Sequence, residues 1–417
     1  MSKTAVVLLV LSFLAAAFFA RANPALGGAV VEDSWTTKEP MPTARAYLGV
    51  STVNGKIYAV GGTSASDIGS VSTGATLTAD ELNTNEMYDP SLNNWETKAP
   101  MPTARAFFGI AAYQNLIFCI GGYNASADYQ YRDTGANEAY DTVTNSWATK
   151  ESLPTPRFAA ATNMVDGKIY VMGGRPMPDF GSALSVNEVY DPQTDTWTTK
   201  NPSPLPLVSS ASAVVDKKIY VLGENTTRLG YNVLEEYDPA TDSWTVKQTA
   251  INHAWFLLTA AATSGINTPK RIYFFGENVT FIYNPYADSL MSGTPAPTPR
   301  LIASVATVND TFYLIGGRTG QWGAITFAYP SALNEQYTPF LYGTPEPSTL
   351  PTPTPRYTPT PTLTPTPSPS LEPTTTPSTE PTPGAEPFPI IPVAAAFVIA
   401  IVVVAAGLLV CLKKRGH

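Results

Sequence analysis

The chain is poor in the side chains from which metal and redox sites are built. Its 417 residues include two cysteines and two histidines. His417 is the last residue and His253 stands alone, so no histidine pair is available for copper and no Ser/His/Asp arrangement can be assembled. Cys119 and Cys411 belong to parts of the chain that differ in character, so we expect no disulfide between them. This scarcity excludes a copper-dependent oxidase, and we expect no metal site and no cofactor.

Positive charge is also in short supply. The 25 lysines and arginines are outnumbered by 33 acidic residues, which gives a formal net charge of −8. An excess of negative charge argues against nucleic acid or an anionic membrane surface as a partner.

What the chain does have is a repeat. An apolar strand that ends in Gly-Gly, or in a remnant of it, occurs six times, at intervals of 40 to 60 residues. A period near 50 residues with this content is typical of a β-propeller with four-stranded blades. The six copies are Ile57–Gly62, Ile117–Gly122, Ile169–Gly174, Ile219–Glu224, Ile272–Glu277 and Phe312–Gly317.

The first copy shows the plan of one blade. An alternating strand leads to the turn Asn54-Gly55, the Gly-Gly strand returns, and Tyr88 and Trp95 mark a third and a fourth strand. The Glu-x-Tyr-Asp and Trp pattern recurs around Tyr140 and Trp147, Tyr190 and Trp197, and Tyr237 and Trp244. The Pro-x-x-Arg lead-in, the Gly-Gly, the Tyr and the Trp together resemble the kelch repeat. The resemblance implies an all-β, six-bladed kelch β-propeller over residues 31–340.

The ends of the repeat array differ from its middle. Leu290 stands where the fifth copy should have Trp, this copy has an enlarged lead-in (residues 251–270), and the sixth copy ends without a Trp. The segment Ser34–Lys38 matches Asn94–Lys98, so the N-terminal segment is expected to supply the outer strand of the last blade. Closing the ring in this way removes exposed sheet edges.

Outside the repeats, the composition predicts a surface-anchored protein. Residues 1–22 have the form of a signal peptide, with an uncleaved membrane anchor as the alternative. Residues 341–389 are rich in Pro and Thr and are expected to form a disordered, extended stalk. Residues 390–412 are long and apolar enough for one transmembrane helix, and the basic tail 413–417 would lie in the cytoplasm. This order also resembles the C-terminal sorting signals of archaeal surface proteins. The expected location is a single-pass cell-surface protein with its propeller outside.

Four arginines recur sixteen residues before the Gly-Gly, and two interpretations of them are open. A ring of arginines around the channel could bind carboxylates, or each arginine could brace the connector between blades. Leu207 and Ala260 take this place in blades four and five. The four residues are Arg45, Arg105, Arg157 and Arg300.

Loops between the second and third strands vary most in length and share one face with the connectors, so recognition is expected there. They carry aromatic residues and arginines that suit sugar stacking or protein contacts, or that simply pack their own loops. These candidates are Tyr129, Tyr131, Arg132, Arg175, Phe180, Arg318 and Trp322. Glycosylation sequons stand at Asn124, Asn225, Asn278 and Asn309.

These patterns predict a cell-surface binding or adhesion module that recognises a glycan or a protein outside the cell. The kelch resemblance leaves one enzymatic alternative open, a metal-independent sugar mutarotase of the sialic acid type. No catalytic residue is predicted from the sequence.

Overall fold

The computed structural model describes residues 30–64, 81–124, 134–176, 183–208, 211–224, 232–247, 258–319 and 329–346. These residues form strands and turns without any helix, so an all-β fold is confirmed for them. They contain no helix that could cross a membrane. The predicted signal segment, most of the predicted stalk, and the predicted span and tail lie outside the described residues.

The described strands form six four-stranded antiparallel sheets, which we call blades one to six in chain order. Blade one contains β2 (Gly49–Val53), β3 (Lys56–Val60), β4 (Asn85–Asp89) and β5 (Asn94–Lys98). Blade two contains β6 (Gly109–Tyr113), β7 (Leu116–Ile120), β8 (Asn137–Asp141) and β9 (Ser146–Lys150). Blade three contains β10 (Ala161–Val165), β11 (Lys168–Met172), β12 (Asn187–Asp191) and β13 (Thr196–Lys200).

The second half of the ring follows the same plan. Blade four contains β14 (Ala211–Val215), β15 (Lys218–Glu224), β16 (Asn232–Asp238) and β17 (Ser243–Val246). Blade five contains β18 (Thr259–Ala262), β19 (Ile272–Phe275), β20 (Thr280–Asn284) and β21 (Ser289–Gly293). Blade six contains β23 (Ser304–Val308), β24 (Thr311–Ile315), β27 (Asn334–Thr338) and β1 (Ser34–Thr37). A small sheet of β22 (Arg300–Leu301), β25 (Arg318–Thr319) and β26 (Tyr329–Pro330) lies beside blade six.

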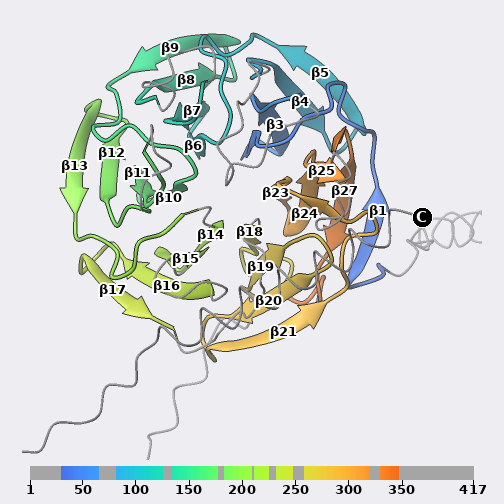
Figure 1. The fold of residues 1–417 in the computed structure, drawn as a ribbon. Coiled ribbons are helices and arrows are strands. Elements are labelled where there is room, and N and C mark those ends of the chain that lie inside the picture. Colours follow the sequence, from blue (N-terminus) through green and yellow to red (C-terminus); the bar gives the residue numbers. More distant parts are fainter. Residues whose placement is uncertain are drawn as a thin grey trace, which may run out of the picture. The chain divides into compact units, whose positions relative to one another are not determined.

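The six sheets are arranged in a ring, with the first strand of each blade innermost (Figure 1). The first strand of each blade contacts that of the next, from β2 through β6, β10, β14 and β18 to β23, which contacts β2 again. The N-terminal strand β1 pairs with β27, with Trp35 opposite Tyr337, as the match of Ser34–Lys38 to Asn94–Lys98 predicts. The two ends of the repeat array therefore share one sheet.

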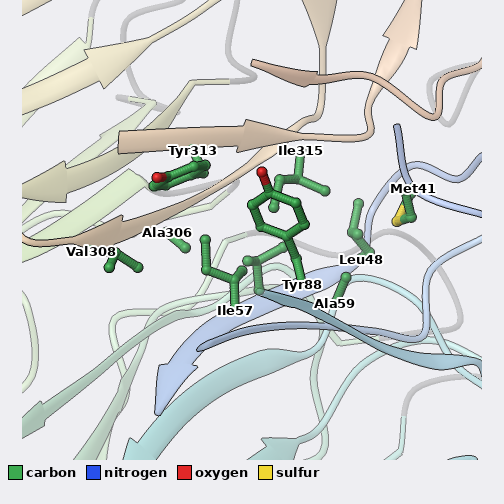
Figure 2. Close-up of a cluster of buried hydrophobic side chains, with 10 residues drawn as sticks. Met41, Leu48, Ile57, Ala59, Tyr88, Ala306, Val308, Tyr313 and Ile315 are labelled. Atoms are coloured by element: carbon green, nitrogen blue, oxygen red, sulfur yellow. The ribbon is translucent and has the colours of Figure 1, made fainter. Parts of the chain in front are cut away.

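The apolar core is divided into six clusters, one at each junction between neighbouring blades. Figure 2 shows the cluster between blades six and one, in which Tyr88 lies beside Ile57, Ala59 and Tyr313. An aromatic residue of the second strand meets the third-strand Tyr of the next blade at every junction, with ring centroids 5.6 to 6.0 Å apart. Such pairs add to the free energy of burial and fix the packing of each blade on the next.

The perimeter of the ring is fastened by a hydrogen-bonded clasp that uses the Trp of the repeat. Trp147 Nε1 of blade two donates to the carbonyl of Ala99 in the connector that leaves blade one. The amide of Ala99 donates to Asn145, which also accepts the Tyr140 hydroxyl. Equivalent indole-to-carbonyl bonds come from Trp35, Trp95, Trp197 and Trp244. The Trp and the Tyr of the sequence pattern are therefore linked through a connector residue and one Asn or Asp side chain.

Blade five differs from the sequence-based expectation. Thr259–Ala262 forms its first strand and Thr259 pairs with Phe275, so residues 263–271 are a long hairpin loop and not part of the lead-in. Ala260 pairs with Phe274 inside the strand. Placing Ala260 at the arginine position was therefore wrong, because counting back from the Gly-Gly remnant ignored the longer hairpin. The equivalent position falls within residues 248–257, outside the described part of the chain.

Candidate functional site

The first strands begin at one end of the ring, which we call the mouth, and a cavity of about 170 Å³ opens there. It is lined by residues that precede or begin the first strands of blades one, two, three, five and six. They include Tyr47, Phe107, Ala159, Leu258, Thr259 and Ile302. A second cavity of about 230 Å³ shares residues with it and is lined by the first strands of all six blades. The mouth cavity therefore leads into the axial channel.

Four residues around the mouth have a backbone conformation that L-amino acids rarely adopt. Tyr47, Phe107, Ala159 and Ile302 have φ angles between 56° and 60°. They are joined in series by backbone hydrogen bonds, because Tyr47 donates to Ile302, Phe107 to Tyr47 and Ala159 to Phe107. We call these four residues the collar. Left-handed backbone is costly for a β-branched residue such as Ile302, and strained residues of this kind cluster at binding sites.

The repeat itself explains why the collar forms. Each collar residue follows an arginine by two positions, and the residue between them, such as Ala46, pairs with the residue after the Gly-Gly. Gly61 and Gly62 have φ angles of 59° and 93°. A Cβ atom on Gly62 would lie 2.6 Å from the carbonyl oxygen of Ala46, so only glycine allows this approach. The Gly-Gly therefore positions the connector and, with it, the collar.

The collar presents an aromatic surface in blades one and two. The rings of Tyr47 and Phe107 are in close, tilted contact, with centroids 3.7 Å apart and an interplanar angle of 32°. Both side chains are partly exposed. Burial of the hydroxyl raises the pKa of Tyr47 to about 12, while nearby Arg318 opposes this shift. Tyr47 is therefore neutral at physiological pH, and its partly exposed ring is the part that a ligand could contact.

The four recurring arginines do not face the channel as an open ring. Their side chains are fully buried, and each forms an ion pair with the Glu of the third strand in its own blade. Arg45 also donates to the carbonyl oxygens of Ala59, Gly61 and Thr84. Burial lowers the pKa of each of these arginines, and the paired glutamate opposes the shift. This geometry supports the bracing interpretation, because the guanidinium groups are used within the blades.

In blade four the arginine is replaced by Leu207, and its glutamate is left without this partner. Glu235 is fully buried and accepts a hydrogen bond of 2.6 Å from Ser203. Its Oε1 atom has no hydrogen-bond partner among the described residues. Burial raises the pKa of Glu235, and the hydrogen bonds from Ser203 and the Leu205 backbone oppose this shift.

The structure describes two of the predicted loop residues, Arg175 and Arg318. Arg175 is partly exposed beside Phe158, with which it exchanges two backbone hydrogen bonds, and Arg318 is nearly buried in β25, where it pairs with Leu301. The remaining candidates Tyr129, Tyr131, Arg132, Phe180 and Trp322 lie outside the described residues. Their role in ligand binding stays a prediction.

Three of the four predicted sequons carry a described asparagine. Asn278 is exposed in the turn between β19 and β20, and Asn309 is exposed in the turn between β23 and β24, at the end opposite the mouth. Asn124 is partly exposed at the mouth, and Asn225 lies outside the described residues.

Sequence reasoning missed the collar. The sequence does contain a signal for it, since an aromatic residue follows Arg45 and Arg105 by two positions. Among the described residues, no group of three or more His, Cys, Asp or Glu side chains is placed to hold a metal ion.

Comparison with known proteins agrees with this architecture. Residues 44–102, 104–154 and 156–204 match the Kelch motif, so the chain contains kelch repeats. It is 28% identical over 155 residues to beta-scruin of Limulus polyphemus, covering 36% of this chain and 15% of that protein. It is 28% identical over 151 residues to Kelch-like protein terF of Aspergillus terreus, covering 35% of this chain and 31% of that protein. It is 30% identical over 159 residues to Kelch repeat and BTB domain-containing protein 12 of Homo sapiens, covering 35% of this chain and 24% of that protein. The matches thus span less than a third of each relative.

Proposed function

We propose that the chain is a protein-binding module, a six-bladed kelch propeller that receives its ligand at the mouth. The collar carries this proposal, because it holds the paired rings of Tyr47 and Phe107 at the mouth cavity. Rigid aromatic side chains lose little conformational entropy on binding and often dominate the binding energy of protein interfaces. Kelch repeats in the relatives named above favour a protein ligand, and aromatic stacking keeps a glycan as the second candidate.

We propose further that the module acts at the cell surface. The support is the order of sequence features: a signal-like segment at 1–22, a Pro/Thr-rich stretch at 341–389, an apolar segment at 390–412 and a basic tail. A stiff stalk would hold the mouth away from the membrane and make it accessible to large ligands. Sequons at Asn278 and Asn309 on exposed turns are compatible with glycosylation outside the cell.

A sugar mutarotase is the second candidate function. Such an enzyme needs carboxylates or arginines that reach its substrate. The four recurring arginines are buried in ion pairs instead, so the geometry favours binding over catalysis. Conversion of any sugar by the purified protein would reverse this preference.

The test uses a secreted fragment of residues 23–350, which includes the segment up to Glu346 that contacts blade five. Binding to cell-surface extracts and to glycan arrays is compared for the unmodified fragment and for Tyr47→Ala and Phe107→Ala. Each substitution should weaken binding at least tenfold. Leu92→Ala is the matched control, because Leu92 is exposed in the turn between β4 and β5, at the end opposite the mouth. Equal binding by the collar variants and the control would place the ligand elsewhere.

A further inference from the structure

The hairpin between the first two strands of blade five, residues 263–271, is longer than its equivalents. In each of the other five blades this turn has two residues, such as Asn54 and Gly55 in blade one. Because the first strands begin at the mouth, all of these turns lie at the opposite end of the ring. The additional residues in blade five can therefore make contacts at that end that a two-residue turn cannot make.

A buried carboxylate of blade six holds one part of this hairpin. Asp310 is 2% exposed and accepts hydrogen bonds of 2.5 to 3.0 Å from the amide and hydroxyl of Ser264 and from the amide of Asn267. The side chain of Asn267 also donates to the carbonyl of Asn309. Hydrogen bonds to an ionised acceptor are stronger than those between neutral groups, so this part of the hairpin is held in one conformation.

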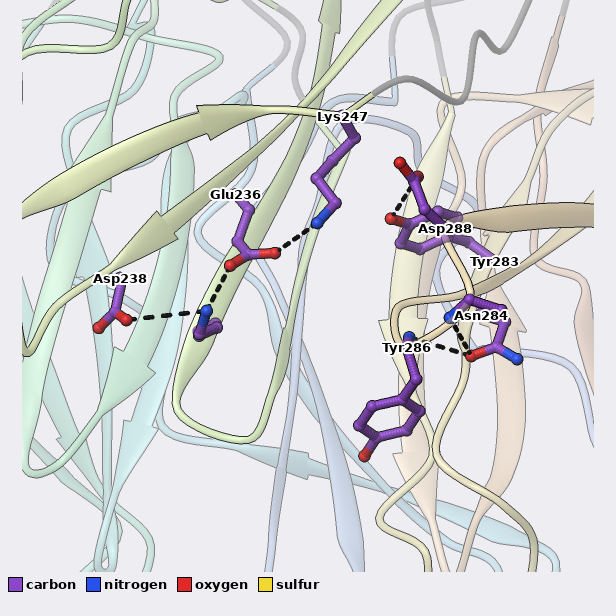
Figure 3. A network of polar contacts seen from close by, with 9 residues as sticks. Glu236, Asp238, Lys247, Tyr283, Asn284, Tyr286 and Asp288 are labelled. Carbon is purple, nitrogen blue, oxygen red and sulfur yellow. Dashed lines mark hydrogen bonds and ion pairs between the residues drawn. The ribbon is translucent and has the colours of Figure 1, made fainter. Parts of the chain in front are cut away.

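Another part of the hairpin is tied to blade four. Lys270 forms an ion pair with Asp216, which also accepts the hydroxyl of Tyr286 at 2.7 Å. Figure 3 shows Tyr286 in the turn between β20 and β21, where its amide donates to the side chain of Asn284. The hairpin is therefore connected to both neighbouring blades.

The chain that leaves β27 lies on this hairpin. We call residues 339–346 the strap. The amide of Gly343 donates to the carbonyl of Asn267 at 2.6 Å, and the amide of Glu346 donates to the carbonyl of Gly265 at 2.9 Å. The carboxylate of Glu346 accepts a further hydrogen bond of 2.8 Å from a backbone amide of the hairpin. Strap and hairpin are thus joined largely through their backbones.

The strap also contacts blade six and the N-terminal segment. Phe340 packs against the apolar cluster between blades five and six, and its carbonyl accepts the hydroxyl of Thr268 at 2.7 Å. The amide of Leu341 donates to Glu32, which precedes β1, at 2.9 Å. The hydroxyl of Tyr342 donates to a carbonyl in the turn between β23 and β24 at 3.2 Å. Three separate parts of the ring therefore hold the strap.

We propose that the strap is an integral part of the propeller, docked on the enlarged hairpin of blade five, and that it fixes where the C-terminal chain leaves the ring. This exit lies at the end opposite the mouth. A pull on the C-terminal chain then acts first on the strap and is shared between blades five and six, instead of peeling β27 from β1. One consequence rests on the proposed function: a membrane anchor that follows the strap is attached to the end of the propeller away from its ligand.

Native-state hydrogen exchange of the full chain, read by mass spectrometry, tests the docking. Four strap amides donate hydrogen bonds, those of Leu341, Gly343, Thr344 and Glu346. The peptide 339–346 should therefore exchange at least about tenfold more slowly within the protein than as an isolated peptide. Exchange at the rate of the isolated peptide would overturn the proposal.

Gly343→Ala perturbs the strap without disturbing its packing. Gly343 has a φ of 92°, and a Cβ atom there would meet no other atom within 4 Å, so alanine strains the backbone alone. It should speed exchange of the strap and of residues 263–271 about three- to tenfold. Gly55→Ala is the matched control, because Gly55 has a φ of 72° and equally open surroundings in the turn of blade one. It should change exchange of the strap less than twofold.

A second variant acts from the side of the hairpin. Thr268→Val removes the hydroxyl that binds the carbonyl of Phe340, and it should speed exchange of the strap by a similar factor. Strap exchange that neither variant changes would overturn the proposal, and so would equal effects of Gly343→Ala and Gly55→Ala on the strap. These measurements need neither a ligand nor a membrane, so their failure is distinct from a failure of the proposed function.

Discussion

Replacing Glu235 by glutamine tests whether blade four carries an uncharged acid in its core. Glu86 in blade one accepts bonds from Arg45 and Thr43, whereas Glu235 accepts from Ser203 and leaves Oε1 without a partner among the described residues. Burial raises the pKa of Glu235 above its ordinary value of about 4.3. The folded protein therefore holds this proton more tightly than the unfolded chain does.

The sign of the pH dependence follows from this difference. The stabilisation by the protonated acid is complete below the unfolded pKa and is lost as the pH rises through the folded pKa. Each unit of difference between the two pKa values costs about 1.36 kcal/mol of folding free energy once the pH exceeds both. Glutamine is neutral at every pH, so Glu235→Gln removes this loss. We therefore expect the free energy of unfolding of the wild type to fall relative to that of the variant from pH 5 to pH 8, by about 1.36 kcal/mol for each unit by which the folded pKa exceeds pH 5.

Urea denaturation followed by tryptophan fluorescence measures both proteins at each pH, and their difference cancels the titration of all other groups. A second variant supports the assignment. Leu207→Arg places a guanidinium where Arg157 stands in blade three, so it should abolish the fall in stability toward pH 8. Parallel pH profiles for wild type and Glu235→Gln would show that the buried carboxyl is not the titrating group, and would refute this reasoning.

Two further predictions concern the ring. Arg157→Met leaves Glu188 buried without its partner, so it should lower the free energy of unfolding, measured in urea, by about 3–5 kcal/mol. The double variant Arg157→Met with Glu188→Leu should recover most of this loss. No recovery in the double variant would contradict the bracing role. Deleting residues 34–38 removes β1 and exposes the edge of β27, so gel filtration should show self-association, and a stable monomer would contradict closure by this strand.

Local pattern was enough to predict the strands and their order. The alternation, the Asn54-Gly55 turn and the spacing from Tyr88 to Trp95 correspond to the observed register, in which these two aromatic residues are paired. The same reasoning failed in blade five, where the hairpin between β18 and β19 is longer than in the other blades. Counting along the sequence cannot distinguish a longer hairpin from a longer lead-in, because both place the same number of residues before the strand.

The same local patterns did not predict which residues form the candidate site. The recurring arginines do lie in the connectors that form the mouth: Arg45, Arg105, Arg157 and Arg300. Their recurrence does not indicate whether the guanidinium groups face the channel or the blade. The direction depends on Glu86 and its equivalents, which lie 31 to 41 residues away in sequence and reach the arginines only when the third strand is paired. The collar was missed for a related reason. Its left-handed backbone depends on the path that the connector takes between blades, which is set by contacts with residues distant in sequence.

The sequence by itself determined that this chain repeats a four-stranded unit and that its N-terminal segment belongs to the last of these units, because hydrophobic period, turn residues and aromatic spacing act within a few residues. Only the tertiary structure decided which charges are buried and which residues form the mouth. Those properties depend on contacts between blades, where a side chain's partner is set by the closure of the ring and not by its neighbours in the chain.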